Sequence, residues 1–145
     1  MPQEYRPVAV AIIRDAEKKI LFVQSAKNLN EWYLPQGGIE KQESPENALF
    51  REIKEELFID REKFTSMRYL GFADLDAEPE RKDRRGFSKG KRYFFFQLEY
   101  TGSKEVVVQK SELENYTWVS TNKIDDVLAT TRKEKTKLIK SFIPR

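Results

Sequence analysis

The sequence contains neither cysteine nor histidine, and each absence excludes a class of chemistry. Without cysteine the chain has no disulfide, no thiolate zinc site and no cysteine nucleophile. Without histidine it lacks the side chain that most often serves as a general base near neutral pH. Acid–base chemistry would therefore fall to carboxylates, lysines, tyrosines or water activated by a metal ion.

Long apolar segments are also absent. No run approaches the roughly 20 residues that span a bilayer, and the first residues do not have the pattern of a secretory signal. We therefore expect a cytoplasmic protein with no membrane partner. The 145 residues suit one domain, spanning residues 1–145, that is long enough to bury a substantial core.

Apolar and β-branched runs predict five strands, at residues 7–13, 20–23, 67–75, 92–100 and 116–119. A helix is expected after Ser44-Pro45, with serine as N-cap and proline in the first turn. Helical spacing of apolar residues predicts two more helices, at 121–129 and 133–142. The chain therefore combines strands and helices in the manner of an α/β protein.

The predicted helix after Ser44 carries an unusual group of acids. Each residue turns a helix by about 100°, so Glu52, Glu55 and Glu56 share one arc while apolar residues fill the arc beside it. Three carboxylates so close repel one another, and a hard divalent cation with oxygen ligands makes such a group favourable. We expect Mg²⁺ or Mn²⁺ there, although this spacing alone is also common on solvated helix faces.

The stretch around this helix, GGIEKQESPENALFREIKEELFI, matches the Nudix box, G-x5-E-x7-R-E-U-x-E-E-x-G-U, and resembles the Nudix hydrolase family. The matching positions are Gly37, Glu43, Arg51, Glu52, Ile53, Glu55, Glu56 and Ile59. The resemblance implies a Nudix-type α/β/α sandwich, in which helices cover both sides of a mixed β-sheet. It also implies that Glu52, Glu55 and Glu56 are catalytic metal ligands, together with a carbonyl of the Gly37 turn, and that Glu43 and Arg51 brace the loop against the helix.

The flanking segments WYLPQGGIEKQES and Tyr5-Arg6-Pro7 resemble the RNA pyrophosphohydrolase and diadenosine polyphosphate hydrolase group. Residues 111–118 resemble a distal loop of that group, whose glutamate, here Glu112, can be an extra metal ligand or the general base. Either Glu56 or Glu112 could take the proton from water. The implied reaction is hydrolysis of a phosphoanhydride in an RNA 5′-triphosphate end or a dinucleoside polyphosphate.

Two other function classes stay open at this point. One is a house-cleaning pyrophosphatase for free nucleotides, against which the short Pro-Gln-Gly-Gly loop argues. The other is a non-catalytic Nudix module that binds nucleotide or RNA, against which the complete set of box carboxylates argues. Protein partners cannot be inferred from the sequence.

Several residues are candidates for binding the substrate. Arg6 could be a strand-end charge in water, or it could bind a phosphate with its fork of donors. Gly38 lets a phosphate approach the backbone because it has no Cβ. Phe142 could stack on a base, as its place in Lys140-Ser141-Phe142 suggests by resemblance, or could be a core contact.

The segment 81–92 carries seven basic residues against one acid. It ends at Lys91, Arg92 and Tyr93, and basic side chains beside aromatic ones suit a phosphate chain and a stacked base. A solvated loop explains the same charge run equally well. The net charge of +3 means that the argument concerns local placement only.

The box departs from the family pattern at Phe58, where the family has glycine. A left-handed phenylalanine would cost roughly 1 to 2 kcal/mol, so we expect another backbone path and a buried ring. Gln42 replaces a frequent glycine, which predicts an ordinary backbone position there. We assign Tyr33 and the tryptophans to packing around the loop, and Lys54 to neutralising the carboxylates.

Overall fold

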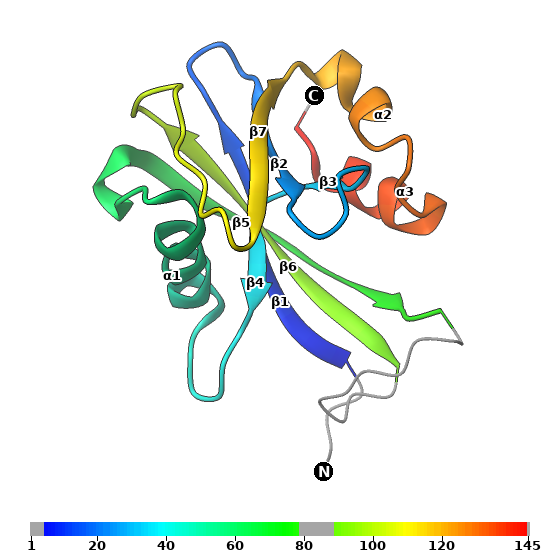
Figure 1. Ribbon diagram of the computed structural model, residues 1–145. Coiled ribbons are helices and arrows are strands. Elements are labelled where there is room, and N and C mark those ends of the chain that lie inside the picture. The colour runs from blue at the N-terminus through cyan, green and yellow to red at the C-terminus, as the bar shows by residue number, and fades with distance from the viewer. Residues whose placement is uncertain (1–4, 79–88, 145) are drawn as a thin grey trace.

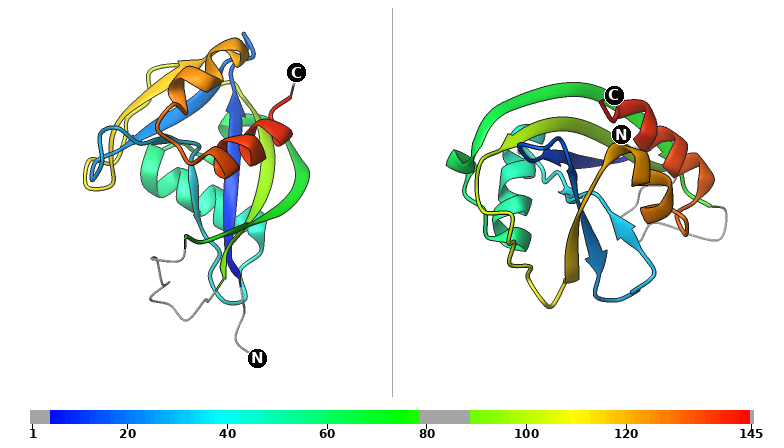
Figure 2. Two further views of the ribbon diagram at one scale, coloured as in Figure 1. Left: turned by 90° about the vertical axis from the view of Figure 1, so that its right-hand side faces the viewer. Right: turned by 90° about the horizontal axis from the view of Figure 1, so that it is seen from above.

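The structure is a computed structural model that describes residues 5–78 and 89–144. A mixed β-sheet lies between helix α1 (Pro45–Leu57) on one face and helices α2 (Ile124–Val127) and α3 (Lys133–Phe142) on the other, as Figure 1 and Figure 2 show. The predicted sandwich with helices on both sides is therefore confirmed. No helix among the described residues is long and apolar enough to cross a bilayer.

The sheet is organised around β1 (Tyr5–Arg14). One edge of β1 runs parallel to β6 (Gly90–Tyr100), which in turn pairs antiparallel with β5 (Phe64–Asp76). The other edge of β1 is divided. It pairs with β4 (Gln36–Gly38) near its start, and with β2 (Ile20–Ser25) only at its end. β2 then continues the sheet through β3 (Trp32–Tyr33) and β7 (Leu113–Val119).

The two faces of β1 separate two apolar cores, because successive side chains of a strand point to opposite faces. Ala9, Ala11 and Ile13 belong to the core beneath α1, where Leu49, Ile53 and Leu57 cover them. Val8, Val10 and Ile12 belong to the core beneath α2 and α3, with Phe95 of β6 and Ile139 of α3. Because both faces of β1 are buried, it reads as a continuous apolar run.

All five predicted strands are present, each longer than expected by a few residues. Ser44 caps α1 as predicted, because its side chain accepts a hydrogen bond of 3.1 Å from the Asn47 backbone N–H. The predicted helix at 121–129 is wrong in extent: it divides into a 3₁₀ turn at Thr121–Lys123 and the single turn of α2. The short strands β3 and β4 were not predicted.

Two expectations about the backbone of the box are wrong. Phe58 does adopt the left-handed conformation, with φ 55° and ψ 32°, and its ring is 54% exposed rather than buried. Its N–H donates to the Lys54 carbonyl, so the residue ends α1 where glycine usually does. Gln42 also has a positive φ of 67° and is not an ordinary position. In both cases the fold holds the turn although the side chain disfavours it.

The strain at Phe58 predicts a stabilising substitution. Phe58→Gly should raise the free energy of unfolding by about 1 kcal/mol, because glycine adopts φ 55° without a Cβ clash and the exposed ring has little packing to lose. For a chain of this size that is about 2 to 4 °C in Tm, measured by thermal unfolding. Phe58→Ala is the matched control: it removes the ring and keeps the Cβ, so an equal gain from it would contradict this explanation.

Candidate active site

The acidic face of α1 packs directly on the glycine turn of β4. A Cβ built on Gly37 would lie 2.0 Å from Glu52 Cγ and 2.1 Å from Glu52 Cδ. The Glu52 side chain therefore occupies the space that a side chain at position 37 would need. This close approach explains why the first glycine of the turn stands at a fixed distance before the helix glutamate.

Arg51 connects this turn to the helix through four groups. Its Nε and Nη2 donate to both oxygens of Glu43, at 2.7 and 2.9 Å, and Nη2 also donates to the Gly38 carbonyl at 3.0 Å. Its Nη1 donates to Glu52 at 2.8 Å and lies 3.5 Å from Glu55. The bidentate pair with Arg51, helped by the Glu40 backbone N–H, lowers the pKa of Glu43 to about 2. The structure thus places Glu43 and Arg51 where the resemblance implies a brace.

Glu56 is the most perturbed acid of the site. Its Oε2 is buried without a hydrogen-bond partner among the described residues. Burial, and after it the carboxylate of Glu52, raise the pKa of Glu56 to about 8, with smaller contributions from Glu112 and Glu55. The loop before β7 brings Glu112 to this place, because the Gln109 N–H donates to the Glu56 carbonyl at 2.8 Å. The four acids predicted from the sequence are therefore gathered at one end of α1.

The acids do not form a closed ring of ligands in the described part of the chain. The physical reason is the repulsion between them: Arg51 takes up the charge of Glu52 and Glu55, and the raised pKa of Glu56 favours its protonated form. Such a donor set nevertheless fits a hard cation, since it consists of oxygen atoms only and includes an unpartnered buried carboxylate oxygen.

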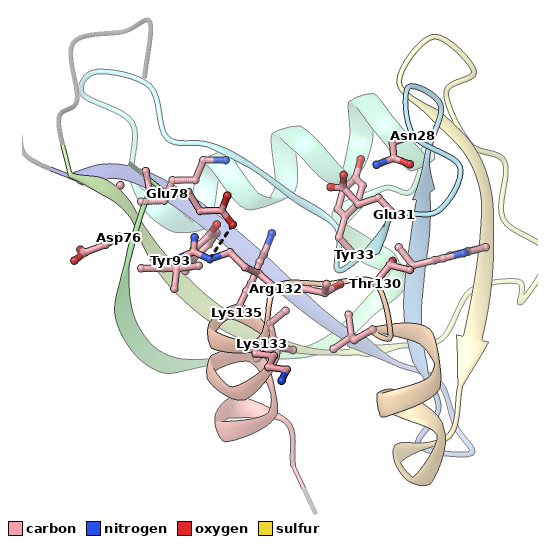
Figure 3. A pocket seen from close by; sticks show the side chains of 18 of the residues that line it. Asn28, Glu31, Tyr33, Asp76, Glu78, Tyr93, Thr130, Arg132, Lys133 and Lys135 are labelled. Atoms are coloured by element: carbon pink, nitrogen blue, oxygen red, sulfur yellow. Dashed lines mark ion pairs between the residues drawn. The ribbon is translucent and has the colours of Figure 1, made fainter. Parts of the chain in front are cut away.

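A cavity of about 900 Å³ opens on the α3 side of the sheet (Figure 3). Its walls come from β1, β6, the end of β5, the residues around β3, the α2–α3 connection and α3. Charged residues that line it are Arg6, Glu31, Asp76, Glu78, Lys91, Arg132, Lys133 and Lys135. A volume of this size is in the range of sites that enclose a small-molecule ligand.

Two residues link the cavity to the acids of α1. Tyr33 lines the cavity, and burial followed by the charges of Glu56, Glu31 and Glu112 raises the pKa of its phenol. Arg6 lies over the turn, since a Cβ on Gly38 would come within 3.0 Å of Arg6 Nη2. The cavity and the acidic end of α1 therefore meet at β4, and a ligand in the cavity could reach the carboxylates there.

Of the predicted substrate-binding residues, Arg6, Lys91 and Tyr93 line the cavity, and Gly38 lies beneath Arg6. Burial raises the pKa of Tyr93 to about 12. Arg92 is not among the lining residues, because successive residues of β6 face opposite sides and its guanidinium makes a bidentate pair with Asp74 at 2.7 and 3.0 Å.

Three other expectations each have their own outcome. The ring of Phe142 stacks on Phe95 at 4.3 Å between centroids, so the structure shows the core contact. Lys54 pairs with Asp60 and not with the carboxylates of the box, which corrects its expected neutralising role. Arg81, Lys82, Arg84 and Arg85 of the basic segment lie outside the described residues.

Several lining residues were missed by the sequence analysis. Arg132 and Lys135 come from the end of the chain, far from the box in sequence, whereas Glu31 lies in a loop only a few residues before Gly37. Tyr33 was assigned to packing alone, although it also borders the acids. A signal was available only for Lys135, which interrupts the apolar spacing of the last helix.

Comparisons with known proteins agree with this geometry. The model of the NUDIX domain matches residues 4–142. An RNA pyrophosphohydrolase of Campylobacter jejuni (strain 81-176) is 30% identical over 147 residues, covering 97% of this chain and 94% of the relative. Over a shorter stretch of 53 residues, the RNA pyrophosphohydrolase of Saccharophagus degradans is 42% identical, covering 37% of this chain and 31% of its own.

Two solved structures resemble the fold at lower sequence identity. The E. coli dihydroneopterin triphosphate pyrophosphohydrolase has a TM-score of 0.75 at 19% identity, covering 97% of this chain and 98% of its own. A C. elegans Ap4A hydrolase in a binary complex has a TM-score of 0.64 at 19% identity, covering 93% and 94%. At these identities the likeness concerns the fold alone.

The raised pKa of Glu56 predicts how stability depends on pH when a chelator removes divalent cations. The unfolded glutamate titrates near pH 4.3 and the folded one near 8, so the folded state binds more protons between these values. Stability should therefore fall as pH rises through this window. Glu56→Gln mimics the protonated form and should raise Tm by a few degrees at pH 8.5, with little effect at pH 4. Equal effects at both pH values would contradict the assignment.

The contact between Gly37 and Glu52 predicts a loss of activity from a single methyl group. Gly37→Ala should lower kcat/KM for a hydrolysable phosphoanhydride by at least about tenfold, because the new Cβ would displace the Glu52 carboxylate. Steady-state kinetics measure the loss. In a Glu52→Ala background the same glycine change should cost little more, since the displaced carboxylate is already absent. Additive losses would show that the methyl group acts elsewhere.

Proposed function

The chain belongs to the Nudix family and is a pyrophosphohydrolase, and from this premise we propose that its substrate is the 5′-triphosphate end of RNA, which it converts to a monophosphate. Dinucleoside polyphosphates are the second substrate class that the same site would accept. The proposal includes a divalent cation, Mg²⁺ or Mn²⁺, as cofactor. Its main support from outside the chain is the relative named RNA pyrophosphohydrolase that aligns over nearly the full length.

The observation that carries the proposal is the junction of acids and cavity at β4. The Glu52 arm lies on Gly37, while the adjacent Gly38 lies under the Arg6 guanidinium on the cavity side. A phosphate at this junction would meet carboxylates from α1 on one side and an arginine fork on the other. The cavity beyond it is large enough for a nucleotide and is bordered by basic side chains.

The residues present fit a divalent cation, since a buried Glu56 oxygen has no partner and the donor set is made of oxygens. Glu52, Glu55, Glu56 and Glu112, with the carbonyl of the Gly37 turn, would hold it. The bound cation would supply charge neutralisation on the phosphate and a lowered pKa for water.

The chain's own residues then supply binding and proton transfer. Arg6 would orient the phosphate chain. The Tyr93 ring borders the cavity but is only 4% exposed, so it presents no free face on which a base could stack. Either Glu56 or Glu112 would accept the proton from the attacking water. Arg51 takes no part in proton transfer in this scheme; it keeps Glu43, the Gly38 carbonyl and Glu52 in one arrangement.

The proposal predicts a substrate order that one assay can measure. With Mg²⁺, the protein should release phosphate or pyrophosphate from 5′-triphosphate RNA or diadenosine tetraphosphate, and more slowly from free deoxynucleoside triphosphates. Glu56→Gln should lower kcat/KM by at least about a hundredfold, because it removes a proposed cation ligand that is also one of the two candidate general bases. Phosphate release and product chromatography measure both effects with the three substrates in parallel.

The matched control is Glu62→Gln, the same change on an exposed glutamate outside the site, which should leave the rates unchanged. A preference for free deoxynucleoside triphosphates would overturn the substrate proposal in favour of the house-cleaning pyrophosphatase. Full activity of Glu56→Gln would overturn the role of Glu56. Activity that persists unchanged with excess chelator would overturn the role of the cation.

A further inference from the structure

Lys135 occupies a position in α3 where the fold calls for an apolar residue. The face of α3 that packs on the sheet carries Ile139, which is buried, and Phe142, which stacks on Phe95. Lys135 precedes these two by four and seven residues, so it lies on the same helical face. Leu138, on the adjoining part of that face, is partly buried in the same core. A lysine therefore replaces the first residue of an otherwise apolar stripe.

The stripe directs Lys135 into the cavity instead of into water. Its ammonium lies 5.6 Å from the centroid of the Tyr93 ring, and Figure 3 shows its side chain rising from α3 beside Arg132. The side chain lines both the large cavity and the small apolar pocket beneath it, next to Val10 and Phe95. The described residues offer this ammonium no hydrogen bond and no ion pair, so its charge faces the cavity unpaired.

This placement costs stability in the isolated protein. Burial, and after it the charge of Lys91, lower the pKa of Lys135, while Glu31 across the cavity opposes the shift. An apolar side chain would complete the stripe without this penalty. A residue that opposes the local packing pattern and points into a cavity is a candidate for binding a ligand. A purely structural role would have to come from the contact with Tyr93, which a methionine could also make.

Position in the sheet relates Lys135 to the reacting end of the site. Tyr93 pairs with Val8, and Val8 pairs with Gly38, so two strand spacings, about 10 Å, separate Tyr93 from the Gly38 turn. Arg6 lies over the turn at one end of this row, and Lys135 lies over Tyr93 at the other. A phosphate at Gly38 would therefore have Arg6 beside it, and an extended polyphosphate or oligonucleotide that follows this row would bring a second phosphate to Lys135.

We propose that Lys135 is a substrate-binding residue whose ammonium holds a phosphate of the substrate other than the one that is attacked. The inference rests on the proposed phosphoanhydride substrate and adds to it a requirement for length. Lys135 thereby favours substrates that carry several phosphates in a row, or a nucleotide chain, over short diphosphates. Recognition is through charge, so it does not depend on the identity of the base.

The test compares Lys135→Met, which keeps the length and completes the apolar stripe, with the wild-type chain. The variant should unfold at an equal or higher Tm, yet should bind a 5′-triphosphate RNA pentamer and inorganic tripolyphosphate about ten- to a hundredfold more weakly. In kinetics the loss should appear in KM more than in kcat, since Lys135 does not touch the reacting phosphorus. The slope of log K against log salt for the pentamer should flatten by about 0.7, as for one lost phosphate contact.

Two control variants distinguish an effect of the positive charge at position 135 from a general effect of positive charge on α3. Lys137→Met makes the same change on an exposed lysine that does not line the large cavity, and it should leave binding unchanged. Lys135→Arg should restore most of the affinity. Equal binding of tripolyphosphate by the wild type and Lys135→Met, or an equal loss in Lys137→Met, would overturn the inference. No binding or turnover of the RNA pentamer by the wild type would count against the proposed function, while tripolyphosphate would still report on Lys135.

Discussion

The site depends on the hydrogen bonds of a single guanidinium, that of Arg51. It holds Glu43 of the loop, the Gly38 carbonyl of β4 and Glu52 of its own helix, at 2.7 to 3.0 Å. A lysine could not make these contacts together, because an ammonium lacks the planar fork that matches a carboxylate. If the guanidinium moved, the Gly37 turn would no longer be held at its present distance from Glu52. The acids would also lose the positive charge of Arg51, which offsets their mutual repulsion. The geometry of the acids is therefore a property of the loop and helix as one unit.

A second constraint is the divided edge of β1. Because β4 takes the first part of this edge and β2 takes only the last pair, the two strands diverge and leave an opening beside Tyr33. The opening lets acids from the α1 side of the sheet meet a cavity on the α3 side. A continuous sheet would have separated them. Chemistry and substrate binding can thus be built on opposite faces, each with its own apolar core for support.

The sequence predicted the parts that follow from local patterns. The strands, the N-cap at Ser44 and the gathering of acids on α1 follow from periodicity and spacing within short segments. The expected backbone conformations of Phe58 and Gln42 were wrong. The conformational energy of an isolated residue disfavours the left-handed region, whereas the surrounding turn holds both residues there. The expected role of Lys54 was wrong because its ion-pair partner is Asp60, a residue beyond the end of the helix that the sequence analysis did not consider. The cavity could not be predicted at all, since its walls come from six segments that only the folded sheet brings together.

Two ionisable groups that the fold leaves unsatisfied, one an acid and one a base, lie at opposite ends of the row from the acids of α1 to the cavity. The Glu56 oxygen has no partner at the acidic end, and the Lys135 ammonium has none at the other, within the described residues. Each is a cost that folding alone does not explain, because a glutamine and a methionine would fit their surroundings without it. A substrate that brings a cation to the first and a phosphate to the second would relieve both. In the proposed complex, the stability that the fold gives up at these two positions would be recovered on binding, and this would direct binding energy toward a long anionic substrate.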